Sequence, residues 1–397
     1  MMASTKFPIY ATGKIDYIEQ DAAQEKAWLV HAQLGSCLFK ESTIESTADI
    51  QTDWSEKIAY ELAQMLYLPA AQYQLADALI DEDYDLVRGS ISCDYTVPGA
   101  VNISAEKLMI QAYPNYNENQ SQFYTVDRVL DAFQQNQVQA PSGYDLPPGI
   151  GDGAETFVGY LMFDAVIGNC DRHDQNFEIQ VLSDGRKELA PTYDHGQALG
   201  ASLMNADRLS KTTADYQNYL GGNFYVDGTD ITSLEAFEIA ASRYPQAAII
   251  WQERLAQITP EQVNEIFNRL PVDRITPLAR KFAEQVIRDG REQVLSLDLK
   301  AALTPKIYQP TLGELSTAAE KFRASGDLVS IAKVDRLLDK MMDSYAGAFP
   351  PPDNLRSSEV KIAPGELGIK LPGVKIKLQS DIVPNQTREP PDRGRGR

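Results

Sequence analysis

A hairpin pattern near the middle of the chain constrains the fold more than any other feature. Residues 177–182 alternate apolar and polar side chains like a half-buried strand, the pair Asp184-Gly185 is typical of a tight turn, and residues 187–191 return. Residues 155–167 before it are apolar on nearly every face, which predicts a buried helix. Because a hairpin brings its two ends together, the residues that flank it are predicted to lie side by side.

Three oxygen-bearing side chains are predicted to converge at this hairpin. Asn176 comes just before the first strand, Asp194 follows the second, and Asp171 lies five residues upstream of Asn176. Carboxylate and amide oxygens suit Mg²⁺, which binds few protein carboxylates and completes its shell with substrate phosphates. The order Asp-x-x-x-x-Asn with a later aspartate matches the kinase catalytic loop, where the first aspartate accepts a hydroxyl proton and the other two residues hold metal.

Two short motifs frame the hairpin. Residues 168–176 read Gly-Asn-Cys-Asp-Arg-His-Asp-Gln-Asn, and residues 190–196 read Ala-Pro-Thr-Tyr-Asp-His-Gly. Together they resemble the HipA-like kinases, a bacterial serine/threonine protein kinase group whose loop also resembles that of phosphatidylinositol kinases. Residues 38–40 (Leu-Phe-Lys) resemble the strand that carries the family's lysine, and residues 54–69 resemble its N-lobe helix.

The resemblance implies a role for each matched residue. Lys40 would bind the nucleotide phosphates and pair with Glu56, Asp171 would act as the catalytic base, and Asn176 and Asp194 would bind the metal. ATP and Mg²⁺ are the implied cofactors, and transfer of the γ-phosphoryl group to a protein serine or threonine hydroxyl is the implied reaction.

Other residues of the loop were weighed with this site. We group Arg172 and His173 with the catalytic residues, Arg172 as a group that would neutralise a phosphate and His173 as one that would hold the loop by hydrogen bonds. His195 is predicted to pack beside the site. No Gly-x-Gly-x-x-Gly precedes Lys40, only Gly35 in a short turn, which leaves open how the phosphates are covered.

The predicted fold class is α+β, a two-lobed protein-kinase-like fold. Residues 26–40 read as two strands around a turn, and apolar side chains recur at helical spacing from Asp53 until Pro69. Further along the chain, Thr-Pro pairs that typically open helices precede a mostly helical region. The predicted parts are a small β-rich N-lobe with one helix (1–100), a larger, mainly helical C-lobe (101–305), a C-terminal helical extension (306–348) and a disordered tail (349–397).

Composition narrows the possible partners and compartment. The 397 residues include 37 basic and 56 acidic side chains, a net charge of −19 that disfavours nucleic acid as a partner. Three cysteines exclude a disulfide framework, and the most apolar window, residues 157–168, is shorter than the ~20 residues of a membrane span. We therefore expect a cytoplasmic protein without a membrane partner. The protein substrate is what the resemblance to the HipA-like kinases implies.

Several alternatives remain open on the sequence. The acceptor could be a small molecule or a phosphoinositide, or the chain could be a pseudokinase that binds nucleotide without transfer. Lys40 could be an ordinary lysine of an edge strand, and the aspartates ordinary turn residues. A metal-dependent hydrolase would instead use residues His173, Asp174, Asp194 and His195, with distant His31 as a third nitrogen ligand.

Overall fold

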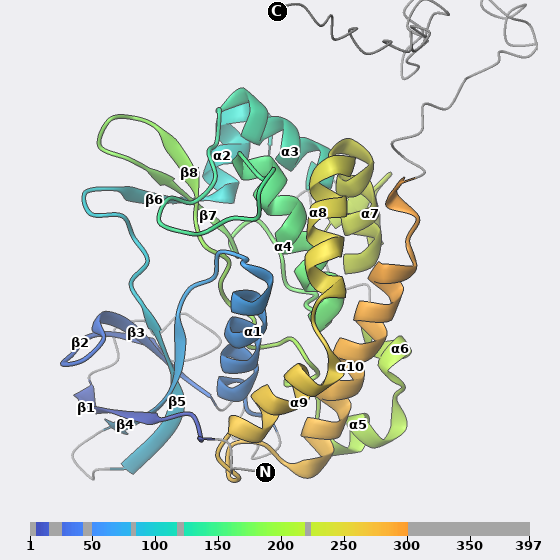
Figure 1. Ribbon diagram of the computed structural model, residues 1–397. Coiled ribbons are helices and arrows are strands. Elements are labelled where there is room, and N and C mark those ends of the chain that lie inside the picture. The colour runs from blue at the N-terminus through green and yellow to red at the C-terminus, as the bar shows by residue number, and fades with distance from the viewer. Residues whose placement is uncertain are drawn as a thin grey trace, which may run out of the picture. The chain divides into compact units, whose positions relative to one another are not determined.

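The computed structural model describes residues 5–15, 26–42, 50–80, 85–116, 123–218 and 224–300. These lie in one compact unit that spans residues 1–303 (Figure 1). The helical extension predicted at 306–348 and the tail predicted at 349–397 lie outside the described residues. The lobe boundary at residue 100 stays a prediction.

A five-stranded sheet in the order β1-β4-β5-β3-β2 forms the N-terminal part. Its strands are β1 (Ile9–Ile15), β2 (Lys26–His31), β3 (Gly35–Glu41), β4 (Tyr73–Ile80) and β5 (Asp85–Cys93). β2 and β3 form the predicted hairpin, whereas β1, which the sequence did not suggest, pairs parallel with β4. Because β3 lies between β5 and β2, Lys40 is not on an edge strand, and that alternative is wrong.

Helix α1 (Asp53–Leu66) packs against β4 and β5 of this sheet (Figure 1). Its buried face includes Trp54, Ile58 and Leu62 at the predicted helical spacing. The helix ends at Tyr67, whose left-handed backbone (φ 58°) caps it just before Pro69.

The predicted central hairpin is confirmed as β7 (Glu178–Val181) and β8 (Lys187–Leu189). β6 (Val101–Ser104), which the sequence did not reveal as a strand, pairs antiparallel with β7. The resulting three-stranded sheet fixes the hairpin whose two ends carry Asn176 and Asp194.

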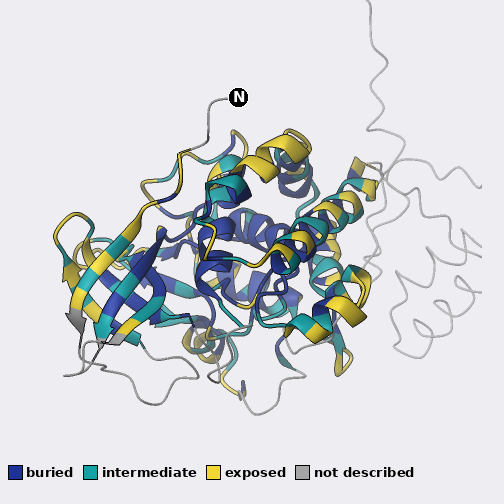
Figure 2. Ribbon diagram, turned by 90° about the horizontal axis from the view of Figure 1, so that it is seen from below, coloured by how far each residue is buried: buried dark blue, intermediate teal, exposed yellow. Residues whose placement is uncertain are grey.

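The C-terminal part is mainly helical and is built around α4 (Gly153–Ile167), in which every residue except Glu155 is buried. Helices α7, α8 and α10 pack against α4. Figure 2 shows buried helices in the interior of the molecule, with more exposed segments around them. The remaining elements are α2 (Ala105–Ala112), α3 (Val126–Gln135), α5 (Asn205–Ser210), α6 (Thr213–Gln217), β9 (Phe224–Val226), β10 (Thr229–Ile231), α7 (Ser233–Arg243), α8 (Pro245–Ala256), α9 (Pro260–Arg269) and α10 (Pro277–Ser296). Both Thr-Pro helix starts are confirmed, at α9 and α10. No helix in the described ranges is long and apolar enough to cross a membrane.

Candidate functional site

Lys40 on β3 lies between two carboxylates that come from different elements. Its ammonium bonds Asp194, which follows β8, and lies 3.5 Å from Glu56 Oε1 on α1. Lys40 is 8% exposed, and burial alone would lower its pKa, but the two carboxylates raise it, so the ammonium stays charged. The structure therefore brings together the lysine, the glutamate and one predicted metal ligand.

The pKa values of the two carboxylates are shifted in opposite directions. Burial raises the pKa of Glu56 to about 7, against the lowering effect of Lys40. Burial also acts to raise the pKa of Asp194, but the adjacent Lys40 ammonium prevails and lowers it to about 2. At neutral pH Asp194 is consequently ionised, so its carboxylate pairs with Lys40 and its oxygens are able to coordinate a cation.

Helix α1 holds the backbone of the segment that carries Asp194. Glu56 Oε2 accepts a hydrogen bond from the amide of His195 (2.9 Å), and the hydroxyl of Ser55 donates to the carbonyls of His195 (2.8 Å) and Ala198 (3.0 Å). Asp194 has a left-handed backbone (φ 60°), a conformation that costs energy outside glycine and is held here by these contacts.

Asp171 and Asn176 lie together on the loop between α4 and β7. The Asn176 amide donates to the Asp171 carbonyl (2.5 Å), while Gln197 donates to the Asp171 carboxylate (3.2 Å) and His173 Nε2 lies 3.6 Å from it. Burial raises the pKa of Asp171, although the neighbouring His173 lowers it. The Asp171 side chain is 31% exposed, so solvent or an acceptor hydroxyl can reach a carboxylate with increased basicity.

Arg172 lies beneath this loop and does not face solvent, since it is 1% exposed. Its guanidinium makes two hydrogen bonds of 2.8 Å with the Asp164 carboxylate of α4, and donates to the Asn176 carbonyl (2.9 Å) and the Thr192 hydroxyl (2.8 Å). It thus ties both ends of the hairpin to the buried helix. These contacts favour a positioning role over the contact with phosphate that we predicted.

The three histidines lie in separate environments. His195 Nε2 lies 3.0 Å from the Thr192 hydroxyl, and burial lowers the pKa of His195 well below the ordinary value. The imidazole ring is therefore neutral, and it packs beside the site. His31, on β2, packs edge-on against Tyr10. Across the described ranges, no group of three His, Cys, Asp or Glu side chains is placed to hold a metal.

Sequence reasoning missed Asp164 and Asn169 as parts of the site's support. Asp164 accepts from Arg172 and from the Asn169 side chain (2.7 Å), and the hydroxyl of Ser233 fixes the Asn169 carbonyl (2.6 Å). The available signal was a carboxylate inside a helix that is apolar on nearly every face, because a buried charge requires a partner.

The donor chemistry fits Mg²⁺ with a phosphate ligand. Asp194 is ionised, and because Asn176 uses its amide nitrogen to bond Asp171, its side-chain oxygen is the atom that could bind a metal. One carboxylate and one amide oxygen, completed by phosphate and water, is a common Mg²⁺ set.

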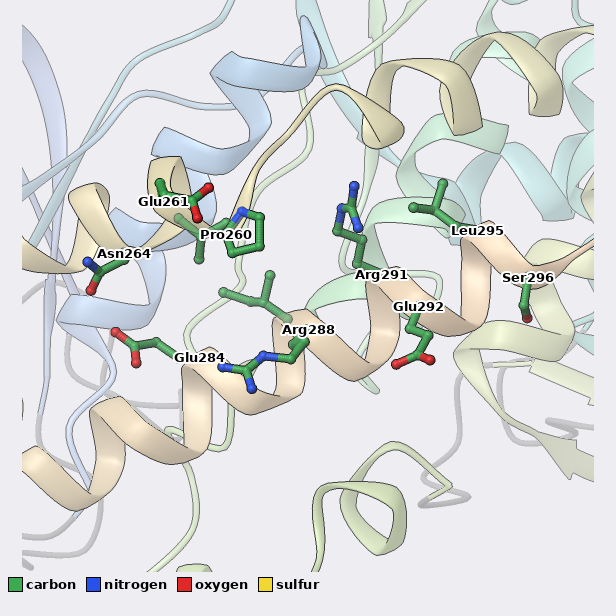
Figure 3. A pocket seen from close by; sticks show the side chains of 11 residues that line it. Pro260, Glu261, Asn264, Glu284, Arg288, Arg291, Glu292, Leu295 and Ser296 are labelled. Atoms are coloured by element: carbon green, nitrogen blue, oxygen red, sulfur yellow. The ribbon is translucent and has the colours of Figure 1, made fainter.

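A groove of about 680 Å³ lies elsewhere, between α9 and α10 (Figure 3). Its lining includes Pro260, Val263 and Ile287 with Arg288 and Arg291, and none of the predicted site residues. The candidate site is therefore assigned from its side chains and not from this groove.

No protein-family model and no curated protein matches the sequence. Among solved structures, the chain is similar to the proinflammatory kinase CtkA of Helicobacter pylori, with a TM-score of 0.56 and 15% identity over 76% of this chain and 100% of that one. It is also similar to HipA of Shewanella oneidensis, solved with HipB and operator DNA, with a TM-score of 0.45 and 11% identity over 70% and 64% of the two chains. The likeness to CtkA confirms the protein-kinase-like α+β fold.

Proposed function

We propose that this protein is an ATP- and Mg²⁺-dependent phosphotransferase that phosphorylates serine or threonine hydroxyls of a protein. The observation that carries the proposal is the cluster of Lys40, Glu56 and Asp194, contributed by β3, α1 and the segment after β8. Residues far apart in the sequence meet there in the arrangement that kinase chemistry requires. The kinase-like fold supports this reading.

The residues of the chain would divide the work as follows. Lys40 binds phosphate oxygens, and Asp194 and Asn176 hold the Mg²⁺, which when bound offsets the phosphate charge. Asp171 orients the acceptor hydroxyl and takes its proton as the hydroxyl oxygen bonds the γ-phosphorus and the bond to the ADP oxygen breaks. Arg172 positions the loop from below.

The test is intact-mass spectrometry after incubation with Mg-ATP, with protein, lipid and small-molecule acceptors offered in parallel. Each transfer adds about 80 Da as a phosphoryl group. We expect wild-type protein to phosphorylate itself or a protein acceptor, and Asp171→Asn and Asp194→Ala to lose transfer while keeping the fold.

Asp184→Asn is the matched control, because Asp184 is an exposed carboxylate on the same hairpin whose side chain bonds Arg186. It should retain wild-type transfer. Wild-type transfer in Asp171→Asn or Asp194→Ala would contradict the proposal. Transfer to lipid or sugar alone would show that the acceptor is not a protein. Nucleotide binding without any transfer would show that the protein is a pseudokinase.

A further inference from the structure

The segment between helices α9 and α10, residues 270–276, is bound to the N-terminal part through one buried arginine. Arg274 lies on this segment and is 2% exposed. Its guanidinium donates to the carboxylate of Asp53 at the start of α1 (2.9 Å), to the carboxylate of Asp77 on β4, and to the Ala76 carbonyl (3.3 Å). The segment is therefore tied to both the helix and the sheet.

Arg88 on β5 holds the same segment from the side of the sheet. Its guanidinium makes hydrogen bonds of 2.9 and 2.8 Å with the Asp53 carboxylate, and it donates to the carbonyls of Asp273 (2.9 Å) and Arg274. Asp53 is 0% exposed, and a buried carboxylate requires partners. Here one guanidinium comes from the sheet and the other from the segment between α9 and α10.

Asp53 is also the point at which the elements that carry Lys40 and Glu56 meet. The hydroxyl of Ser42, two residues after Lys40, donates to the Asp53 carboxylate (2.9 Å), and the Ser42 carbonyl accepts from the amide of Thr52 (3.2 Å). Glu56 follows Asp53 by three residues and so lies about one turn further along α1. A displacement of Asp53 would therefore move the end of β3 and the start of α1.

The contact between Lys40 and Glu56 depends on support of this kind. At 3.5 Å it is longer than an ordinary hydrogen bond and provides little restraint of its own. We propose that Arg274 is a positioning residue for phosphoryl transfer: by holding Asp53, it keeps the Glu56 carboxylate beside Lys40. This inference rests on the proposed function, in which Lys40 binds the nucleotide phosphates.

A purely structural role is the competing explanation. Arg274 also bonds Asp77, and that contact would by itself fasten the segment to the sheet. Such a role predicts a lower free energy of unfolding but unchanged nucleotide affinity in the folded protein. The positioning role predicts weaker binding of phosphate, and no additional weakening once Glu56 has been replaced, because residues that act through one another are non-additive.

The experiment is a double-mutant cycle of Arg274→Met and Glu56→Gln, with affinity measured by calorimetry. The probes are Mg²⁺ with a non-hydrolysable ATP analogue, and adenosine, which has no phosphate. In Arg274→Met the Asp53 carboxylate keeps Arg88 as its countercharge, so we expect a folded protein, which urea unfolding checks. We expect the analogue to bind about tenfold more weakly, adenosine to bind as to wild type, and Glu56→Gln with Arg274→Met to bind no more weakly than Glu56→Gln alone.

Arg243→Met is the matched control. Arg243, on α7, also bonds two carboxylates, those of Asp127 (2.8 Å) and Asp131 (2.7 Å), and its replacement should leave analogue affinity unchanged. Arg274→Lys keeps a positive charge for Asp53 and should bind the analogue more tightly than Arg274→Met does. If Arg274→Met does not fold, the same cycle is measured with Arg274→Gln, whose amide is still a donor for a carboxylate.

Equal analogue affinity in Arg274→Met and Arg243→Met would overturn the inference and leave the proposed function intact. The same holds if the effects of Arg274→Met and Glu56→Gln multiply, because Arg274 would then act independently of Glu56. Adenosine binding that weakened as much as analogue binding would also contradict it, since phosphate would not be involved. Absence of analogue binding by folded wild-type protein would overturn both the inference and the proposed function.

Discussion

Removal of the Arg172 guanidinium should show how the loop between α4 and β7 is held in place. In Arg172→Met the Asp164 carboxylate, 1% exposed, loses its countercharge and two hydrogen bonds of 2.8 Å. The Asn176 carbonyl and the Thr192 hydroxyl lose a donor in the same step. The side chain of Met fills much of the space of Arg, so the effect measured is mainly electrostatic.

The magnitude follows from the burial of the pair. Breaking a buried ion pair by removing one partner costs about 3 to 5 kcal/mol of the free energy of unfolding. Asp164 keeps one hydrogen bond, from the Asn169 side chain, which places the expected loss near the lower end, about 3 kcal/mol. Replacing both partners, as in Asp164→Leu with Arg172→Met, should recover most of that loss, since no charge is then left buried.

The assay is urea unfolding of both variants, paired with phosphoryl transfer. The double variant should be stable but poorly active, because Asn176 and Thr192 still lack the donor that joins the two ends of the hairpin. If the single variant lost less than about 1 kcal/mol, the range of exposed ion pairs, the buried clamp would be refuted. Full activity in the stable double variant would refute the positioning role.

Two further predictions concern the ion cluster and β5, the strand that pairs with β3 beside Lys40. Lys40 lowers the pKa of Asp194 from 3.8 to about 2 despite burial. The pair therefore contributes to the free energy of unfolding when the pH is above the ordinary aspartate pKa, and this contribution is lost as the pH falls from about 4 to 2. Acid titration of stability should therefore show wild type losing about 2 kcal/mol more than Asp194→Asn over that window, and parallel curves would contradict this. A Cβ added at Gly89 would lie 2.5 Å from the Phe39 ring and closer still to the Lys40 carbonyl. Gly89→Ala should cost about 1 to 3 kcal/mol in urea unfolding and weaken nucleotide binding, whereas Gly151→Ala, near only a flexible side chain, should do neither.

Local signals in the sequence were sufficient to predict the helix and strands that position the site residues. The alternation of residues 177–182 and the Asp184-Gly185 turn predicted β7 and β8, and helical spacing after Asp53 predicted α1. Both patterns depend on neighbours a few residues apart, which one sequence displays directly. The meeting of Lys40, Glu56 and Asp194 required the family resemblance as well.

Long-range pairings were not predictable in the same way. β1 joins β4 in parallel across more than fifty residues, and β6 joins the central hairpin from the opposite side of α4 in sequence. Arg172 was misjudged because an arginine on a loop is ordinarily exposed, and only packing shows that it turns inward to Asp164.

Helix α1 couples two sides of the ion cluster through a single turn. Glu56 approaches Lys40 with one carboxylate oxygen and accepts from the His195 amide with the other, and Ser55 bonds the backbone of the same segment. A displacement of α1 would therefore have two effects at once. It would move the segment that carries Asp194, and it would weaken the contact between Glu56 and Lys40. Residues joined in this way do not contribute independently, so substitutions at Lys40 and Glu56 should be non-additive in their effect on nucleotide affinity.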